Sequence, residues 1–203
     1  MNRWEGALVR RGSVDRKTLE TDISVTLDLD GRGQAQVCTG IGFFDHMLTA
    51  FAKHSGFDLT VTAAGDLEVD GHHTVEDVGI SLGQALRQAV HAGKGIARFG
   101  EATVPMDEAL VQAVLDISGR AYLAWDVPYR APMIGDFDTQ LTVEFFRAFV
   151  HNAAITLHVR KLAGENDHHI VEAAFKAVAR ALGAACRRTG SDEVLSTKGS
   201  LQG

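Results

Sequence analysis

A short pattern of histidine and glutamate occurs twice in this chain. The segment Gly71–Glu76 contains His-His-x-x-Glu, and Asp167–Glu172 contains it again, 96 positions later. Each copy runs into an apolar stretch with helical character. Imidazole and carboxylate without thiolate suit manganese, iron or zinc better than calcium. The repeated pattern therefore indicates a duplicated fold that carries a metal centre.

Helical geometry separates the side chains of each copy. Successive residues of an α-helix turn by about 100°, so His72 and Glu76 share one face, whereas His73 points away from His72. Adjacent histidines on a helix are poorly placed to bind the same ion. We therefore expect two metal ions, each with ligands from both repeats of the chain.

Two further ligands are expected on the helices that precede the motifs. His46 lies in the apolar segment Phe43–Lys53, and an offset of 98, which aligns Phe57–Val61 with Ile155–Val159, places Glu144 opposite it. His151 is the competing candidate, although it would lie about 10 Å further along the helix than Glu144. Eight ligands would leave each ion with open positions, as in a catalytic site. The predicted metal ligands are His46, His72, His73, Glu76, Glu144, His168, His169 and Glu172.

A second group of residues could bind an anion. Arginine, lysine and hydroxyl groups near a metal centre favour a phosphorylated substrate. Each such residue, taken alone, is more often a solvated surface charge, but Ser196–Gly199 has little reason to exist in a packed core. The group comprises Arg98, Arg120, Lys176, Ser196 and Lys198.

The composition restricts the class of protein. The 203 residues are 45% hydrophobic and 23% charged, which is typical of a globular protein, and no apolar run approaches the roughly 20 residues of a membrane span. Met1–Arg11 lacks a signal-peptide stretch, so a cytoplasmic location without membrane partners is expected. The net charge of −6 argues against nucleic-acid binding. Cys38 and Cys186 form no redox or zinc motif and are expected to be buried thiols.

Periodicity predicts three strands, a helix, a strand and a helix in each half. The first half is predicted as strands 6–14, 21–29 and 34–39, helix 43–53, strand 58–63 and helix 73–91. The second half is predicted as strands 102–105, 109–117 and 122–127, helix 141–151, strand 156–161 and helix 169–187. Asp30–Gly33 indicates a hairpin between the second and third strands.

The economical fold for this order is an α/β (α+β) protein, a two-layer α/β sandwich made twice. We expect repeats at residues 1–95 and 96–203 that together form one compact unit. The tail, residues 191–203, is expected to be a loop that is ordered only if something binds it.

Taken together, the motifs resemble those of the imidazoleglycerol-phosphate dehydratase family of histidine biosynthesis, in its monofunctional form, over nearly the whole chain. The stretches that carry the resemblance are Phe43–Leu48, Asp70–Asp77, Arg98–Gly100, Pro105–Leu110, Asp116–Arg120, Asp167–Ala173, Phe175–Ala177 and Ser196–Gly199. The chain departs from the family pattern at Glu144, where members have histidine before Phe-Phe; glutamate can still bind manganese.

The resemblance implies a duplicated β3-α-β-α unit of the ribosomal protein S5 domain 2-like fold. It implies two Mn²⁺ ions per active site and a homo-oligomer of 24 subunits built from trimers, with active sites at subunit interfaces. The implied reaction is a hydro-lyase reaction that converts D-erythro-imidazole glycerol phosphate to imidazole acetol phosphate and water, through a metal-bound imidazolate and a diazafulvene-like intermediate.

The resemblance also assigns roles to individual residues. Glu20 matches a carboxylate near the substrate and is the candidate acid–base group, with Asp107 a weaker candidate. The implied phosphate-binding positions are Arg98, Arg120, Lys176, Ser196 and Lys198, and the implied catalytic group is Glu20, His46, Glu76, Glu172 and Asp107.

Other classes of function remain open from the sequence. A metal-storage assembly would need the histidines but no phosphate-binding residues. A metal-dependent phosphoesterase would use both groups and release inorganic phosphate. A kinase is disfavoured because the chain has no glycine-rich phosphate loop.

Overall fold

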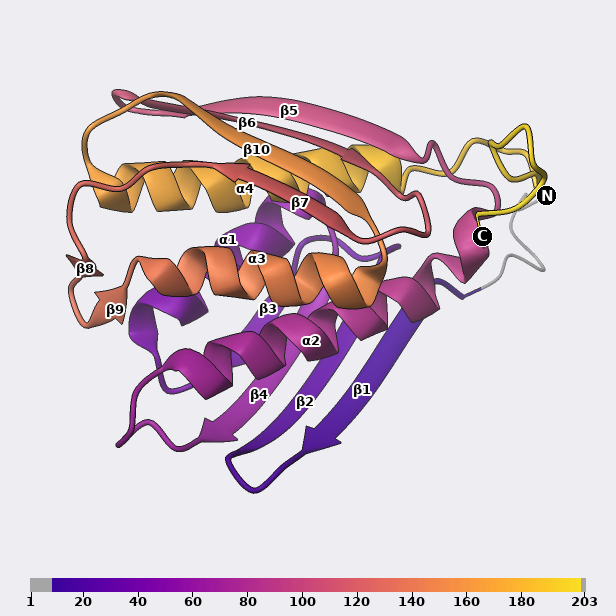
Figure 1. Ribbon diagram of the computed structural model, residues 1–203. Coiled ribbons are helices and arrows are strands. Elements are labelled where there is room, and N and C mark those ends of the chain that lie inside the picture. The colour runs from indigo at the N-terminus through magenta and orange to yellow at the C-terminus, as the bar shows by residue number, and fades with distance from the viewer. Residues whose placement is uncertain (1–8, 202–203) are drawn as a thin grey trace.

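The computed structural model describes residues 9–201. Within them, two four-stranded sheets have equivalent strand orders, and Figure 1 shows one above and one below the helices. The first sheet has the order β1-β2-β4-β3 and consists of β1 (Arg11–Lys17), β2 (Thr21–Asp28), β3 (Ala35–Cys38) and β4 (Asp58–Gly65). The second has the order β5-β6-β10-β7 and consists of β5 (Phe99–Met106), β6 (Ala109–Asp116), β7 (Tyr122–Asp126) and β10 (Thr156–Ala163). The duplication predicted from the motifs is thus present in the sheets themselves.

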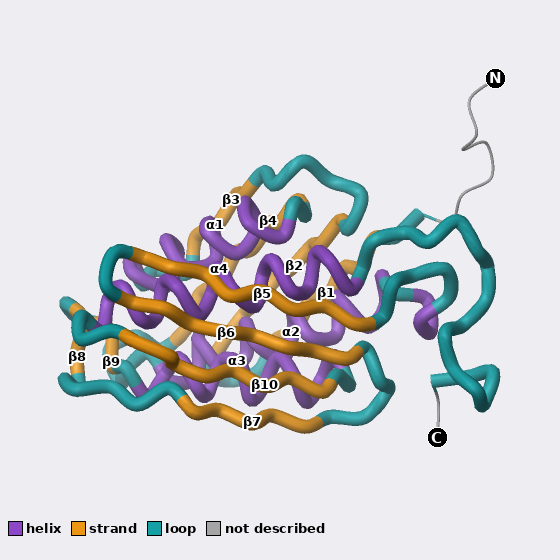
Figure 2. Tube along the Cα trace, turned by 90° about the horizontal axis from the view of Figure 1, so that it is seen from above, coloured by secondary structure: helices purple, strands orange, loops and turns teal. Residues whose placement is uncertain are grey.

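Helices lie between the two sheets, as both views of the chain show (Figures 1 and 2). Residues 9–201 contain four α-helices. They are α1 (Gly42–Ser55), α2 (His72–Ala89), α3 (Gln140–Ala153) and α4 (Asp167–Ala185). Helix α2 packs on β1 and β2 and also on α3, while α4 packs on β5 and β6 and also on α1. Each half is therefore a sheet covered by helices, and the halves meet through their helices, which confirms the predicted fold class.

Phenylalanine side chains fill the space between the two halves. Phe44, Phe51, Phe145 and Phe149 are all buried, and each such burial stabilises the fold by about 2–3 kcal/mol. The rings of Phe51 and Phe149, which the offset of 98 makes equivalent, lie 6.2 Å apart. The two repeats thus share one core.

Two equivalent glycines let each outer strand approach a helix closely. A Cβ atom on Gly12 of β1 would lie 2.0 Å from the carbonyl oxygen of Ala85, and one on Gly100 of β5 would lie 1.9 Å from that of Ala181. Real Cβ atoms are never so close to a backbone oxygen, so only glycine fits at these two positions.

The predicted hairpin at Asp30–Gly33 is wrong, because β4 lies between β2 and β3. Strand β3 pairs with β4 in parallel, with Ala35 opposite Leu59. The turn residues serve a different purpose: the side chain of Asp58 accepts hydrogen bonds from the backbone N–H groups of Arg32 and Gln34, each at 2.8 Å. These bonds fix the loop to the start of β4 and direct the chain across it.

Several boundaries and two short elements also differ from the prediction. The strand predicted at 6–14 lies partly outside the described residues, and β1 runs from Arg11 to Lys17. A short hairpin of β8 (Met133–Ile134) and β9 (Phe137–Asp138), and the 3-10 turn η1 (His91–Gly93), were not predicted. Two-residue strands carry no periodicity, which explains the omission.

The tail residues 191–201 contain no helix or extended strand, as expected of a loop. The end of the chain nevertheless contacts the segment before β5, through bridges between Lys94 and Val194 and between Ile96 and Arg188. Within residues 9–201, no helix has the length and apolarity needed to cross a membrane.

Candidate metal and anion sites

One group of three predicted ligands converges at the start of α4. Among residues 9–201, His46, His168 and Glu172 form the cluster whose potential ligand atoms all lie within 4.8 Å of one another. The Nε2 atoms of His46 and His168 are 3.2 and 3.3 Å from the same carboxylate oxygen of Glu172. His46 comes from the first half and the other two from the second, so this cluster joins the two repeats.

Local structure at the start of α4 fixes this cluster. Asn166 caps the helix, and its side chain accepts hydrogen bonds from the backbone N–H groups of His168 and His169. This cap satisfies helix N–H groups that otherwise have no partner. The spacing of four then places His168 and Glu172 on one face, toward α1.

Glu172 carries the negative charge of the cluster. Its side chain is only 8% exposed, and burial by itself would raise the pKa of the carboxyl. The hydrogen bond from Lys176 Nζ at 2.6 Å and the contact with His46 outweigh burial, so the pKa of Glu172 is lowered. The group is therefore an anion at neutral pH, as a metal ligand must be.

The repeat-related counterparts of these three residues lie beside the cluster. His72 and Glu76 on α2 are 3.9 Å apart, and Glu144 on α3 forms an ion pair with Arg147. A pocket of about 920 Å³ is lined by Glu144, His72, His46 and His168 together. The offset that equated His46 with Glu144 is thus reflected in their placement around one cavity.

The second histidine of the first motif points elsewhere. The rings of His72 and His73 are inclined by 88°. His73 Nδ1 lies 3.0 Å from Asp66 and 3.9 Å from Glu20. The hydrogen bond to Asp66 is the main cause that raises the pKa of His73. The expectation that adjacent histidines diverge is therefore confirmed for this pair.

The second motif repeats this arrangement. The rings of His168 and His169 are inclined by 83°, and His169 Nδ1 lies 2.7 Å from Glu108, with Asp107 3.7 Å from Nε2. The hydrogen bond from His169 is the main cause that lowers the pKa of Glu108 to about 2 and raises that of His169. Glu20 and Glu108 occupy equivalent turns, β1–β2 and β5–β6.

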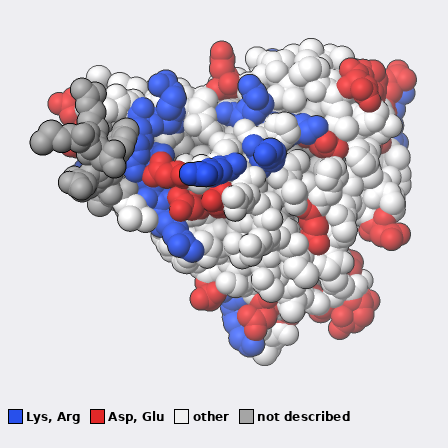
Figure 3. All heavy atoms as spheres, turned by 180° about the vertical axis from the view of Figure 1, so that it is seen from behind, with Lys and Arg blue, Asp and Glu red and all other residues white. Residues whose placement is uncertain are grey.

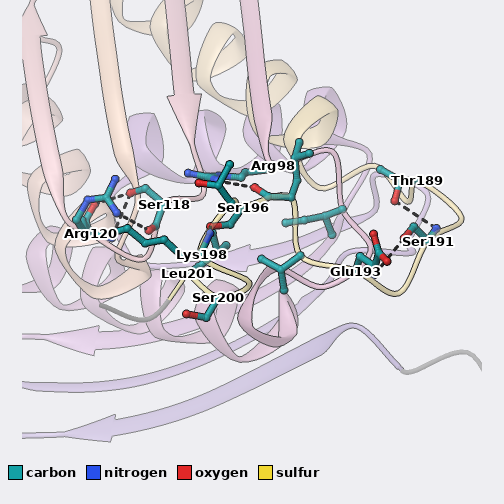
Figure 4. Close-up of a pocket in the computed structure, with 14 residues that line it drawn as sticks. Arg98, Ser118, Arg120, Thr189, Ser191, Glu193, Ser196, Lys198, Ser200 and Leu201 are labelled. Atoms are coloured by element: carbon teal, nitrogen blue, oxygen red, sulfur yellow. Dashed lines mark hydrogen bonds between the residues drawn. The ribbon is translucent and has the colours of Figure 1, made fainter.

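Four of the five predicted anion-binding residues gather in a second pocket, of about 860 Å³ (Figure 4). Arg98 is held by Asp116, at 2.7 and 3.0 Å, and donates to the carbonyl of Leu195 at 2.5 Å. The backbone N–H of Lys198 donates to the Ser196 hydroxyl. The residues of the predicted group that line the pocket are Arg98, Arg120, Ser196 and Lys198.

The fifth residue, Lys176, lies with the histidine cluster instead, paired with Glu172. The two sites occupy opposite ends of α4, whose 19 residues span about 28 Å, and Figure 1 shows the tail at the far end from the start of α4. On the face seen from behind, Asp and Glu atoms predominate at the end opposite the tail (Figure 3).

A sequence model of the imidazoleglycerol-phosphate dehydratase family matches residues 39–182. The chain belongs to the imidazoleglycerol-phosphate dehydratase family. It is 57% identical over 196 residues to the imidazoleglycerol-phosphate dehydratase of Granulibacter bethesdensis, with 96% of this chain and 100% of the relative covered. It is 56% identical to that of Acetivibrio thermocellus, with 95% and 99% covered. Because these relatives are named as dehydratases, the prediction of a hydro-lyase is confirmed.

Solved structures of imidazoleglycerol-phosphate dehydratase also match. The Staphylococcus aureus structure has a TM-score of 0.81 and 41% identity, and covers 88% of this chain and 99% of that one. The Pyrococcus furiosus structure has a TM-score of 0.80 and 42% identity, with 92% and 99% covered. The fold of this dehydratase family is therefore shared over nearly the whole chain.

Two carboxylates that contact the motif histidines of this dehydratase chain, Glu108 and Asp66, were not predicted. Glu108 and Asp66 contact His169 and His73 more closely than Asp107 and Glu20 do. Glu108 stands 88 positions after Glu20, and β5 begins 88 positions after β1, so a second offset could have identified it. His151, the competing ligand, lies in the last turn of α3.

Proposed function

We propose that the protein removes water from D-erythro-imidazole glycerol phosphate and forms imidazole acetol phosphate in L-histidine biosynthesis. The family supplies the reaction class, and the single observation in the fold that supports it most is the cluster of His46, His168 and Glu172. A separate anion pocket around Arg98 and Arg120 suits the phosphate of such a substrate. A metal-storage protein would need no such pocket.

The cluster has the donor chemistry of a manganese site. Two imidazole nitrogens and an anionic carboxylate converge there, with no thiolate among them. We assign one Mn²⁺ to this set and a second to His72, Glu76 and Glu144, with His73 and His169 completing the predicted eight ligands. Bound there, the two ions would supply Lewis acidity that favours negative charge on the imidazole ring.

The reaction removes a hydroxyl group and a proton from neighbouring carbons of the substrate. The hydroxyl leaves the carbon next to the imidazole, a proton leaves the next carbon, and the resulting enol becomes the ketone. Glu20, half-exposed and 3.9 Å from His73 Nδ1, is the proposed acid–base group that carries protons between substrate and solvent. Asp107, 79% exposed beside His169, is the weaker candidate.

The remaining residues hold the substrate in place. The phosphate would be bound by the residues of the anion pocket, Arg98, Arg120, Ser196 and Lys198. Lys176 lies with the histidine cluster, so it would contact the phosphate only if the cluster and the pocket form one site. Since the two ends of α4 are about 28 Å apart, one chain cannot bring its own cluster and its own pocket to one small substrate. We therefore propose active sites between subunits, within the implied 24-subunit assembly built from trimers. The cytoplasmic location stays a prediction.

A dehydratase assay with elemental analysis tests this function. We expect turnover of imidazole glycerol phosphate that is lost on chelation and returns with Mn²⁺. A protein replete with metal but without turnover would point to storage, and release of inorganic phosphate from the same substrate would identify a phosphoesterase.

Single substitutions test the ligand assignment. His72→Ala and His168→Ala should each lose bound metal and activity, whereas His158→Ala, on the exposed face of β10, serves as the matched control. Retention of two ions per subunit in either variant would contradict the assignment. Comparing Glu144→Ala with His151→Ala identifies the eighth ligand, since only the former should lose metal.

A further inference from the structure

Leu201 is buried although it lies near the end of the chain. Only 7% of its surface is exposed. It lines the anion pocket on one side and, on the other, a hollow of about 420 Å³ with Val90, Ile117 and Ala153. Figure 4 shows Leu201 next to Lys198. An apolar side chain thus anchors the described end of the tail directly behind the anion-binding residues.

Two glycines make the socket that receives Leu201. A Cβ atom on Gly93 would lie 2.1 Å from Leu201 Cδ1, and one on Gly119 would lie 1.9 Å from its carbonyl oxygen. Both glycines have positive φ, 79° and 74°, in the left-handed region that other residues rarely adopt. They belong to different halves of the chain, so the socket exists only where the two repeats meet.

The tail is therefore held at two points. Upstream, Val194 bridges to Lys94, and Arg98 donates to the carbonyl of Leu195. Downstream, Leu201 enters its socket. Ser196 and Lys198 lie on the short loop between these anchors. A loop fixed at both ends has few conformations to lose when it binds a ligand.

We propose that Leu201 is a positioning residue, an apolar latch that holds Ser196 and Lys198 over Arg98 and Arg120. This role deepens the proposed function, since it rests on the assignment of the pocket to the substrate phosphate. Lys198 and Ser196 contribute to binding only in chains whose tail is docked. Apparent affinity for the anion therefore falls in proportion to the docked fraction.

Limited proteolysis of the full protein reads out docking without any catalysis. In Leu201→Ala, we expect trypsin to cleave the Lys198–Gly199 bond about ten times faster than in the wild type, because cleavage follows the population of the open tail. Intact mass identifies the product, which loses residues 199–203. The control is Leu162→Ala, an exposed leucine on β10. Equal cleavage rates in Leu201→Ala and the wild type would overturn the latch.

Binding of inorganic phosphate, measured by calorimetry, is the second readout. Leu201→Ala should weaken it several-fold while the melting temperature stays unchanged, and Leu201→Met should restore it. In the dehydratase assay the same variant should raise KM more than it lowers kcat. Because proteolysis and phosphate binding need no turnover, they test the latch even if the protein proves not to be a dehydratase. Wild-type phosphate affinity in Leu201→Ala would contradict the positioning role.

A double-mutant cycle tests the socket itself. Gly93→Ala places a methyl group where Leu201 Cδ1 lies and should speed cleavage at Lys198 by itself. In the Leu201→Ala background the clash with the leucine is absent and only the backbone strain of alanine at positive φ remains. The same change should therefore speed cleavage much less than it does in the wild type. Additive effects of the two substitutions would show that Gly93 and Leu201 act independently, against the proposal.

Discussion

The imidazole of His168 is oriented by aromatic neighbours. The ring of Phe43 meets it edge-on, at 5.1 Å between centroids and 71° between planes. Phe137, from the β8–β9 hairpin, contacts Phe43 in turn at 5.1 Å. Such contacts around a ligand restrict its rotamers and so reduce the entropy lost on binding. The hairpin absent from the sequence prediction therefore supports the cluster.

Truncating Phe43 should weaken metal binding without removing a ligand. In Phe43→Ala the His168 ring loses its edge contact, and we expect about tenfold lower Mn²⁺ affinity, measured by metal titration. Phe43→Leu, which keeps apolar volume beside Phe137, is the matched variant and should recover part of the loss. Wild-type affinity in Phe43→Ala would show that Asn166 and α1 suffice to orient the histidine.

Arg120 gives the corresponding prediction for the anion pocket. Arg120 is an exposed residue of the pocket, and a neutral side chain there removes a charged donor. We expect Arg120→Ala to raise KM about tenfold or more with metal content intact. Arg32→Ala, in the β2–β3 loop away from the pocket, is the control. Unchanged KM in Arg120→Ala would exclude a phosphate role for this residue.

At the residue scale, the sequence identifies the candidate ligands more readily than the side chains that orient them. His46, His168 and Glu172 could be selected because residue type and helical spacing are written in the chain. Asp66 and Glu108 could not be selected in the same way, because each reaches its histidine from a turn whose position depends on the whole sheet. Side chains joined through tertiary structure leave no local period.

At the scale of elements, the repeat predicted the helices best. α1 and α3 begin 98 positions apart, as do β4 and β10, so one offset sufficed to locate both pairs. The strand order was the main failure. A glycine-rich turn after β2 ordinarily indicates a hairpin. Here the backbone N–H groups of Arg32 and Gln34 donate to Asp58 instead, and the loop carries the chain past β4 to β3.

The close approach of strand and helix in each half makes Gly12 and Gly100 sensitive positions. Gly12→Ala and Gly100→Ala should each destabilise the fold by about 3 kcal/mol, because the added Cβ meets backbone that cannot move independently. Gly42→Ala, where a Cβ meets nothing within 4 Å, is the control. Chemical denaturation measures the loss, and stability equal to that of Gly42→Ala would contradict the packing.

At the scale of the whole molecule, an arginine pair ties the halves together. Arg10, before β1, is buried, forms an ion pair with Asp30 and donates a hydrogen bond to the carbonyl of Cys186, after α4. Arg188 also reaches Asp30, at 2.8 Å. The hydrogen bond from Arg10 is the main cause that lowers the pKa of Asp30 from 3.8 to about 2. The Asp30 carboxylate thus connects Arg10, near the start of the chain, with Arg188, near its end.

This contact makes stability depend on pH in the acid range. Because the folded pKa of Asp30 is depressed, its contribution is full above about pH 4 and is lost as pH falls toward 2. Asp30 is 42% exposed, so we expect only about 1 kcal/mol after solvent screening. Asp30→Asn should be less stable than the wild type at pH 7, and the difference in unfolding free energy should shrink between pH 4 and 3. A difference independent of pH would contradict this.

The separation of the two sites along α4 predicts that each active site combines residues of two chains. His168→Ala and Arg120→Ala damage sites at opposite ends of α4. At substrate concentrations below KM, the first should therefore be inactive alone and the second should keep about a tenth of the activity or less. If active sites combine the histidine end of one chain with the anion pocket of another, co-expression restores intact sites, about a quarter of them with random mixing of two chain types. His168→Ala with Glu172→Ala, which damage the same end, should restore none. Absence of activity in both mixtures would contradict shared sites and assign the cluster and the pocket to separate functions, because within residues 9–201 they lie at opposite ends of α4.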